Sequence, residues 1–167
     1  MDILAQLASW QITPPLIEHP PLFTCDAADN LLLERPGTRL KNLFLRDNYG
    51  RRHALLLTTP HKQVDLKTLS KQLGWSRIGF ASADRLDRYL GVEPGHVSVL
   101  ALVNDALNQD VELWLDNDLV DGDHFHCHPL RNTATLLLSK ADLALFAAQT
   151  GHTPQWIDVP SRDSRKP

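Results

Sequence analysis

The chain has 167 residues, of which 43% are hydrophobic and 22% are charged, a size and composition typical of one globular domain with a single core. A formal net charge of −3 excludes a generally basic protein that coats nucleic acid, although it leaves room for a local positive patch. Only two cysteines, no N-terminal signal pattern and no apolar stretch of membrane-spanning length predict a reduced, cytoplasmic protein with no membrane contact. The sequence contains no P-loop and no G-x-G-x-x-G motif, so ATP or NAD chemistry is not expected.

Helices and strands interleave along the chain. Ile3, Leu4, Leu7 and Trp10 have the spacing of a helix with one buried face. Further helices, bounded by capping residues, glycine or proline, are predicted over 27–34, 66–73, 82–90 and 140–149. Strands are predicted over 16–19, 40–47, 53–59, 77–81, 99–103, 111–115, 123–128, 133–138 and 155–159.

Several of the connections between these strands are as short as hairpins. A mixed sheet with flanking helices, an α/β fold of the α+β type, therefore fits better than a doubly wound parallel sheet. We expect one domain over 1–160, and a polar tail over 161–167 that is disordered.

Three histidines, His124, His126 and His128, stand at alternate positions and therefore share one face of a strand. Three imidazoles with one open position would suit a zinc-bound water. They span roughly 13 Å of strand, so one ion could bind an adjacent pair but scarcely all three, and a further ligand such as His96 or His152 would be needed. We expect no metal, with His124 and His126 partly exposed near a sheet edge.

Lys41 and Asn42 lie inside an otherwise apolar strand. A lysine there costs free energy unless its ammonium group reaches water or an anion. Two interpretations remain open, a surface lysine extended into water or an anchor for a phosphate or carboxylate.

The glycine-rich loop over 91–97 either supplies backbone groups to a reacting carbonyl or is a simple turn. No G-x-S-x-G motif is present, and Cys127 would face away from His126 and His128, so we expect it to be a small core residue. The sequence therefore lacks the pattern of a serine or cysteine nucleophile.

Six short segments, considered together, resemble the prolyl-tRNA editing family. This is the YbaK/ProX-type deacylase superfamily, related to the editing domain inserted in bacterial prolyl-tRNA synthetase. The segments are PPLFT at 20–24, PG at 36–37, KNLFLRD at 41–47, FAS at 80–82, GVEPG at 91–95 and HPLRNTAT at 128–135. The resemblance runs in order from about residue 1 to about residue 158.

The resemblance implies a fold like that editing domain and a free-standing enzyme that hydrolyses the ester of mischarged proline tRNA, closest to the branch that removes alanine. It implies that Lys41 anchors the 3′-terminal nucleotide with Asn42 beside it, that backbone at Gly95 positions the carbonyl, and that His128 borders the pocket. In this family water is organised by backbone groups and the substrate's ribose hydroxyl, with no metal, cofactor or covalent intermediate.

We further expect a small apolar pocket and a local basic patch. The pocket residues are predicted to be Ile17, Phe23 and Phe44. The patch, which would bind the acceptor end of proline tRNA, is predicted to contain Arg39, Lys41, Arg46 and Arg131. Prolyl-tRNA synthetase is a possible second partner.

Two other functions stay open on the sequence. One is a non-catalytic protein on the same fold that binds tRNA ends or the synthetase. The other is a metal-dependent hydrolase that uses the histidine cluster.

Overall fold

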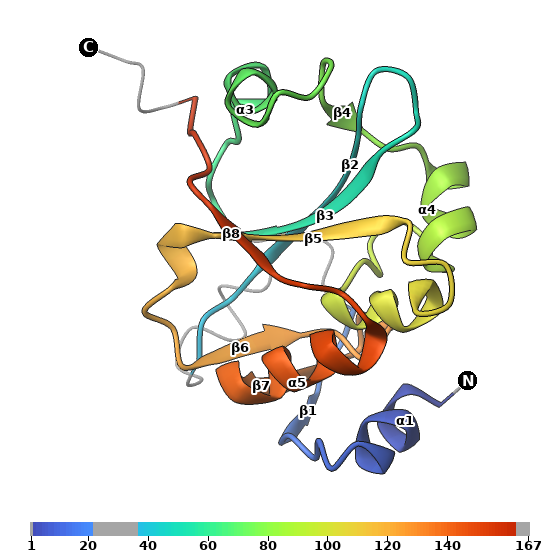
Figure 1. Ribbon diagram of the computed structural model, residues 1–167. Helices are drawn as coiled ribbons and strands as arrows, with labels where there is room; N and C mark the ends of the chain where they lie inside the picture. Colours follow the sequence, from blue (N-terminus) through green and yellow to red (C-terminus); the bar gives the residue numbers. More distant parts are fainter. Residues whose placement is uncertain (1, 22–36, 163–167) are drawn as a thin grey trace.

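The computed structural model describes residues 2–21 and 37–162, in which the strands form two sheets (Figure 1). The larger sheet contains, in spatial order, β4 (Gly79–Phe80), β2 (Lys41–Arg46), β3 (His53–Thr58), β5 (Val111–Asp116) and β8 (Gln155–Ile157). The smaller sheet contains β1 (Leu16–Glu18), β7 (Ala134–Ser139) and β6 (His124–Cys127). The smaller sheet is antiparallel, whereas β3, β5 and β8 run parallel within the larger one, so the predicted mixed architecture is confirmed.

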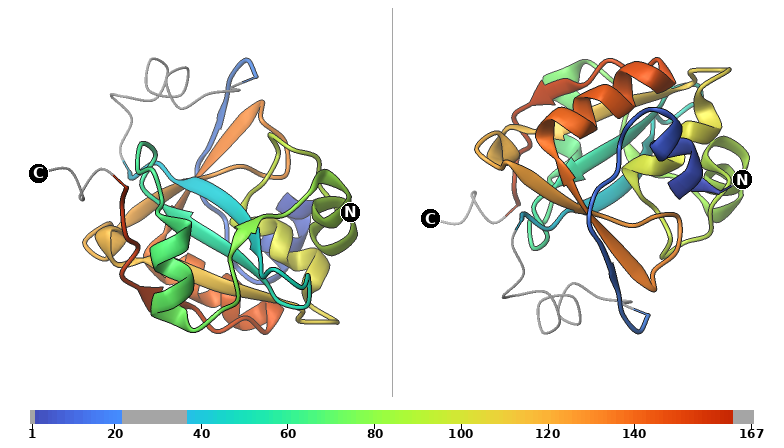
Figure 2. Two further views of the ribbon diagram at one scale, coloured as in Figure 1. Left: turned by 90° about the horizontal axis from the view of Figure 1, so that it is seen from above. Right: turned by 90° about the horizontal axis from the view of Figure 1, so that it is seen from below.

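Helices cover both faces of the larger sheet (Figure 2). They are α1 (Ile3–Ser9), α3 (Leu66–Leu73), α4 (Ala83–Leu90) and α5 (Lys140–Thr150). Each begins at a capping Asp or Ser, and α3, α4 and α5 each end at a left-handed glycine, as the sequence predicts.

The apolar side chains form two clusters, one on each side of the larger sheet. The main core joins its inner face to α4, α5 and the smaller sheet, through residues such as Leu57, Phe125 and Phe146. The second cluster lies under α3 and includes Leu45 and Trp114. Since successive side chains of a strand point to opposite faces, β2 contributes Phe44 to the main core and Leu45 to the cluster under α3.

The segment predicted as a strand over 99–103 is instead a 3₁₀ helix, η1 (Val99–Asp105). The first four residues of its apolar run, 99–102, are fully buried, and such a run has no periodicity that separates a strand from a buried helical turn. The Ser98 hydroxyl oxygen accepts the N–H of Leu100 at 3.2 Å and so begins the helical turn.

Two residues of the predicted tail are bonded to the fold. Ser161 forms an antiparallel bridge with Val64, and the Arg162 N–H donates to the carbonyl oxygen of Gln63 at 2.8 Å. Those two residues belong to the folded part, while 163–167, like the helix predicted over 27–34, lies outside the described residues. Over the described ranges, no helix has both the length and the apolar character needed to cross a membrane.

A buried polar network joins η1 to the end of α5. Asp105 accepts hydrogen bonds from the N–H groups of Asp110 and Val111 and from Nε2 of His152 at 3.0, 2.9 and 2.8 Å. The other ring nitrogen of His152 contacts the Thr150 hydroxyl at 2.8 Å. One carboxylate therefore holds together the start of β5 and the turn after α5.

We predict that Asp105→Ala lowers the free energy of unfolding by about 3–5 kcal/mol, because three donors, two of them buried, lose their acceptor at about 1–3 kcal/mol each. Urea denaturation followed by circular dichroism measures the change. Asp87→Ala, at an exposed position on α4, is the control and should change stability by less than about 0.5 kcal/mol. A loss as small as the control's would contradict the structural role of Asp105.

Candidate active site

Lys41 and Asn42 lie at the open edge of β2, on opposite faces of the sheet. Strand β4 pairs only with Leu45 and Arg46, so within the described residues the first half of β2 has no neighbour on that side. Lys41 shares its face with Leu43 and Leu45, toward α3, whereas Asn42 shares the face of the core residue Phe44. A ligand that crosses this edge can contact both side chains.

The Lys41 ammonium group is held in place by backbone. Its Nζ donates to the carbonyl oxygen of Lys62 at 2.8 Å, and the side chain lines a depression of about 420 Å³ beside Leu43 and the start of α3. An ammonium group has three protons, and this contact uses one. Lys41 therefore keeps donors for a bound anion.

The Lys62 carbonyl oxygen, which accepts the hydrogen bond from Lys41, belongs to a loop that a buried ion pair holds in place. Lys62 Nζ donates to Asp116 and Asp118 at 2.7 Å each and to the carbonyl oxygen of Val159 at 3.1 Å, and the hydroxyl of Thr58 donates to Asp116 at 2.6 Å. Burial alone would lower the pKa of Lys62, but the hydrogen bonds that it donates to the two carboxylates raise the pKa above the ordinary lysine value. Thr58 is also the cross-strand neighbour of Lys41. The network therefore fixes both the backbone of Lys41, through Thr58, and its ammonium group, through the Lys62 carbonyl.

His128 directly follows β6, and the groups around its imidazole shift its pKa downward. Burial lowers the pKa of His128, the contact with the Ala134 carbonyl raises it, and the nearby His19, His96 and His126 lower it, with a net decrease. Nδ1 lies 3.4 Å from that carbonyl oxygen and so carries the proton. The lone pair of Nε2 is then available as an acceptor.

Residues of β1 and β7 extend the site on the same face of the smaller sheet. Ile17 is the cross-strand partner of Thr135, and the side chain of Thr135 bonds to Nε2 of His19 at 2.8 Å. Nδ1 of His19 donates to the Pro20 carbonyl at 2.9 Å, so Nε2 accepts the Thr135 hydroxyl proton. Neither His19 nor Thr135 is predicted as a site residue from the sequence. The available signal is that His19 stands two positions after Ile17 and therefore shares the strand face of Ile17.

The glycine-rich loop over 91–97 lies close to His128. His96, whose charge would act on His128, is the neighbour of Gly95 in the chain. Gly95 has φ +90°, a conformation that a side chain would strain, and the space where a Cβ would point is open. The loop thus brings the exposed backbone of Gly95 toward His128, and its role in binding a carbonyl stays a prediction.

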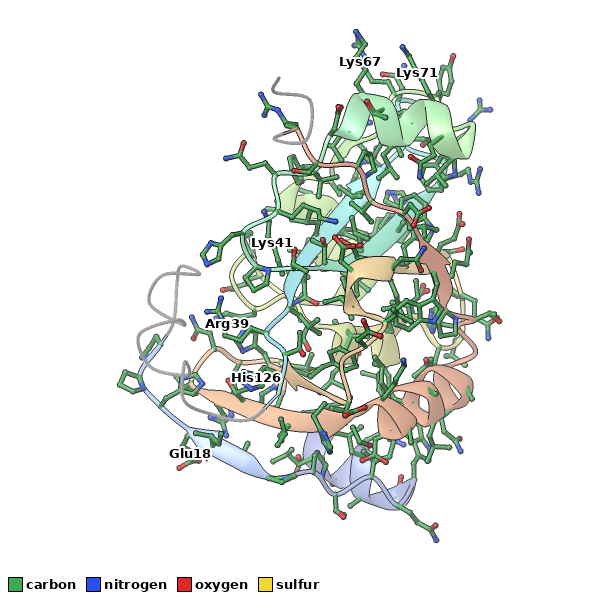
Figure 3. The ribbon with its side chains drawn as sticks, turned by 90° about the vertical axis from the view of Figure 1, so that its left-hand side faces the viewer. Glu18, Arg39, Lys41, Lys67, Lys71 and His126 are labelled. Atoms are coloured by element: carbon green, nitrogen blue, oxygen red, sulfur yellow. The ribbon has the colours of Figure 1, made fainter. Side chains whose placement is uncertain are left out.

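A bridge at Thr38 connects the histidine side of the site to Lys41. The Thr38 N–H donates to the His124 carbonyl oxygen at 2.8 Å, and the His126 N–H donates to the Thr38 carbonyl oxygen at 2.9 Å. Lys41 follows three residues later, a span of at most about 11 Å. Figure 3 shows Lys41 and His126 on the same side of the molecule, with Arg39 between them.

Two motif amides have a polar atom that lacks a hydrogen bond. Asn42 Oδ1 and Asn132 Nδ2 are both buried and have no partner among the described residues. Close to Asn132, Leu130 has φ +63°, a conformation uncommon for a residue with a side chain. Buried polar atoms are normally bonded, so these two amides mark positions that a polar ligand can satisfy.

Other predicted site residues are placed differently. Phe44 packs against the rings of His53 and Tyr89 in the core, so it does not form a free pocket wall. Phe23 lies outside the described residues. Arg131 donates to the Thr133 hydroxyl at 2.7 Å and lies 3.6 Å from Glu18, at the rim of the site.

The histidine cluster also differs from expectation. β6 is an edge strand, as predicted, but His126 is buried rather than partly exposed, because Gly37 and Leu137 pack near it. Among residues 2–21 and 37–162, no three His, Cys, Asp or Glu side chains are arranged to hold one metal ion. Cys127 is a core residue as predicted, and burial raises the pKa of its thiol to about 12, so it is no nucleophile at neutral pH.

Comparisons with known proteins agree on one family. A family model described as an aminoacyl-tRNA editing domain matches residues 19–146. The chain is 36% identical over 157 residues to a prolyl-tRNA editing protein, ProX, of Acetoanaerobium sticklandii, covering 94% of this chain and 95% of the relative. It is 33% identical over 153 residues to a prolyl-tRNA synthetase associated domain-containing protein of Bos taurus, covering 89% and 88%.

Two solved structures share the fold. A hypothetical protein named APE2540 superposes with a TM-score of 0.73 at 21% identity, covering 95% of this chain and 99% of that one. A second crystal structure, of a candidate trans-editing enzyme for prolyl tRNA synthetase, gives a TM-score of 0.70 at 18% identity and covers 95% and 92%. These two likenesses bear on the fold alone.

The lowered pKa of His128 predicts a pH-dependent stability. As pH falls below the ordinary histidine value of about 6.5, the unfolded chain binds a proton that folded His128 resists, so stability decreases. We expect His128→Gln to lose less thermal stability than wild type between about pH 7.5 and about pH 5.5. His124→Gln, on an exposed part of the same strand, is the matched control, and equal slopes for His128→Gln and wild type would contradict the prediction.

Proposed function

Because the chain belongs to the aminoacyl-tRNA editing domain family, in its prolyl-tRNA editing branch, we propose that it is a free-standing deacylase for mischarged proline tRNA, with Ala-tRNA(Pro) as its substrate. The reaction adds water to the ester that joins the amino acid to the terminal ribose. The observation that carries the proposal is the open edge of β2, where Lys41 lines the depression on one face and Asn42, with its unpartnered Oδ1, lies on the other.

Lys41 is the proposed anchor for the 3′-terminal nucleotide. Its ammonium group is oriented by the Lys62 carbonyl and keeps two protons for a phosphate oxygen. Across the edge, Asn42 Oδ1 and Asn132 Nδ2 lack partners, and polar groups of the ribose or of the aminoacyl group would satisfy them.

The proposed chemistry relies on positioning and on stabilising charge in the transition state. Water adds to the ester carbonyl carbon, and backbone N–H groups near Gly95 stabilise the oxyanion of the tetrahedral intermediate. Nε2 of His128 accepts a hydrogen bond from the water or from the ribose hydroxyl that organises it. The bond to the ribose oxygen then breaks, that oxygen takes a proton, and the free amino acid leaves.

The proposed selectivity is a second sieve based on size. A synthetase pocket gains only about 1–3 kcal/mol from each methylene that distinguishes two amino acids, so a smaller one is charged at a measurable rate. In the editing site Ile17 lies on the face of Thr135 and His128, where it can limit the room for a larger side chain. Phe23 remains a predicted second wall, and Arg131 lies at the rim.

A deacylation panel tests the proposal. Proline tRNA charged with Ala, Cys, Ser or Pro is offered to wild type, to His128→Ala and to the matched control His124→Ala. We expect Ala-tRNA(Pro) to lose its amino acid fastest with wild type and the control, and at least about tenfold more slowly with His128→Ala. Binding without hydrolysis of any of the four esters would favour a non-catalytic binding protein and overturn the proposal.

The anchor role of Lys41 gives a separate prediction. Lys41→Ala should raise KM roughly 10- to 100-fold, since a hydrogen bond to a charged group contributes about 1.5–3 kcal/mol. Lys62→Met should raise KM by a smaller factor, because it releases the loop whose carbonyl orients Lys41. In the double variant the Lys62 effect on KM should disappear while its effect on thermal stability remains. Additive effects on KM would show that Lys62 does not act through Lys41.

A further inference from the structure

Two adjoining depressions cover the α3 side of the larger sheet. The first, which contains Lys41, is also lined by Lys67, Phe80 and Arg162. The second, of about 440 Å³, is lined by Lys67, Lys71, Trp75 and Arg77 among others. Lys67 lines both, so the two depressions form one continuous surface, which we name the α3 face.

The α3 face is positively charged in a chain that is negative overall. Its lining residues include five cations, Lys41, Lys67, Lys71, Arg77 and Arg162, and one carboxylate, Asp65. Asp65 is buried and accepts the N–H and hydroxyl of Thr68 as the cap of α3. Since the whole chain carries −3, its excess carboxylates lie elsewhere, and the α3 face attracts anions.

The spacing of the cations suits a polyanion. Lys67 and Lys71 are exposed and lie about one helical turn apart, about 6 Å along α3, so both can contact a backbone with one charge per nucleotide. Figure 3 shows both projecting outward from α3 at the top of the view, with Lys41 and Arg39 below α3. Phe80 is 63% exposed beside them, an apolar ring on which a base can stack.

We propose that the α3 face binds the phosphate backbone of the acceptor stem, a contact separate from the ester site. The proposal rests on the proposed function for the identity of the RNA. In the proposed complex the aminoacyl end lies on the histidine side of the site, the terminal nucleotide lies at Lys41 on the open edge of β2, and the stem continues over Lys67 and Lys71. Exposed cations beside an exposed aromatic ring favour RNA over an acidic protein as the occupant.

The test uses the full chain and an uncharged hairpin RNA with the acceptor-stem sequence of proline tRNA. Its binding is followed by fluorescence anisotropy between about 0.05 and about 0.2 M salt. Lys67→Ala/Lys71→Ala should bind about three- to tenfold more weakly, and the slope of log affinity against log salt should fall by about 1.4–1.8, because two phosphate contacts are lost. With Ala-tRNA(Pro) as substrate, KM should rise by a similar factor while kcat is unchanged.

The control is Arg51→Ala/Arg88→Ala, which removes two exposed charges from the turn after β2 and from α4. We expect its salt slope to match wild type. Unchanged RNA binding by the α3 variant, as expected if these lysines meet an acidic protein, would overturn the inference, as would an equal loss in the control. If wild type binds the hairpin through α3 but releases no amino acid, the inference stands and the proposed function fails.

Discussion

The alternation of side chains along β2 is the constraint on which the site depends. Six residues of this strand pair with β3 in continuous register, so the direction of each side chain is fixed. Lys41 must face α3 if Asn42 is to face the main core, and the ladder allows no other arrangement. Because β4 is short, both side chains stand at an edge that a ligand can cross. A longer β4 would cover this edge and separate Lys41 from Asn42.

The buried cation Lys62 has a different role from Lys41, although both belong to the same network. Lys62 is nearly enclosed and is neutralised by Asp116 and Asp118, so its charge is compensated within the protein. Burying such a pair is expensive unless the remaining donors are satisfied, and here a third contact reaches the Val159 carbonyl. Among the described residues, Lys41 donates to a backbone carbonyl and to no carboxylate, so its positive charge is not neutralised by a described side chain. The fixed ion pair holds the loop, and the loop orients the uncompensated charge.

The sequence predicts most elements because their end signals are local. Capping side chains and left-handed glycines place α3, α4 and α5 to within a residue or two. The buried run over η1 carries no such periodic signal, so it was wrongly predicted as a strand. The motifs also indicate Lys41, Asn42, Gly95 and His128, but they say nothing of tertiary contacts. The packing of Phe44 against His53, the bond between His19 and Thr135 and the Lys62 network each join residues distant in sequence.

The distribution of charge also bears on turnover. A uniformly basic protein would bind any part of a tRNA and would retain the product, because each phosphate contact adds affinity without regard to the ester. In the proposed complex, a net charge of −3 with cations gathered on the α3 face would restrict favourable encounters to one orientation of the RNA. Only the aminoacyl end would then add contacts with the ester site, and these would be lost when the amino acid leaves. Deacylated tRNA would be held by the α3 face alone, and it would dissociate the more readily as salt rises.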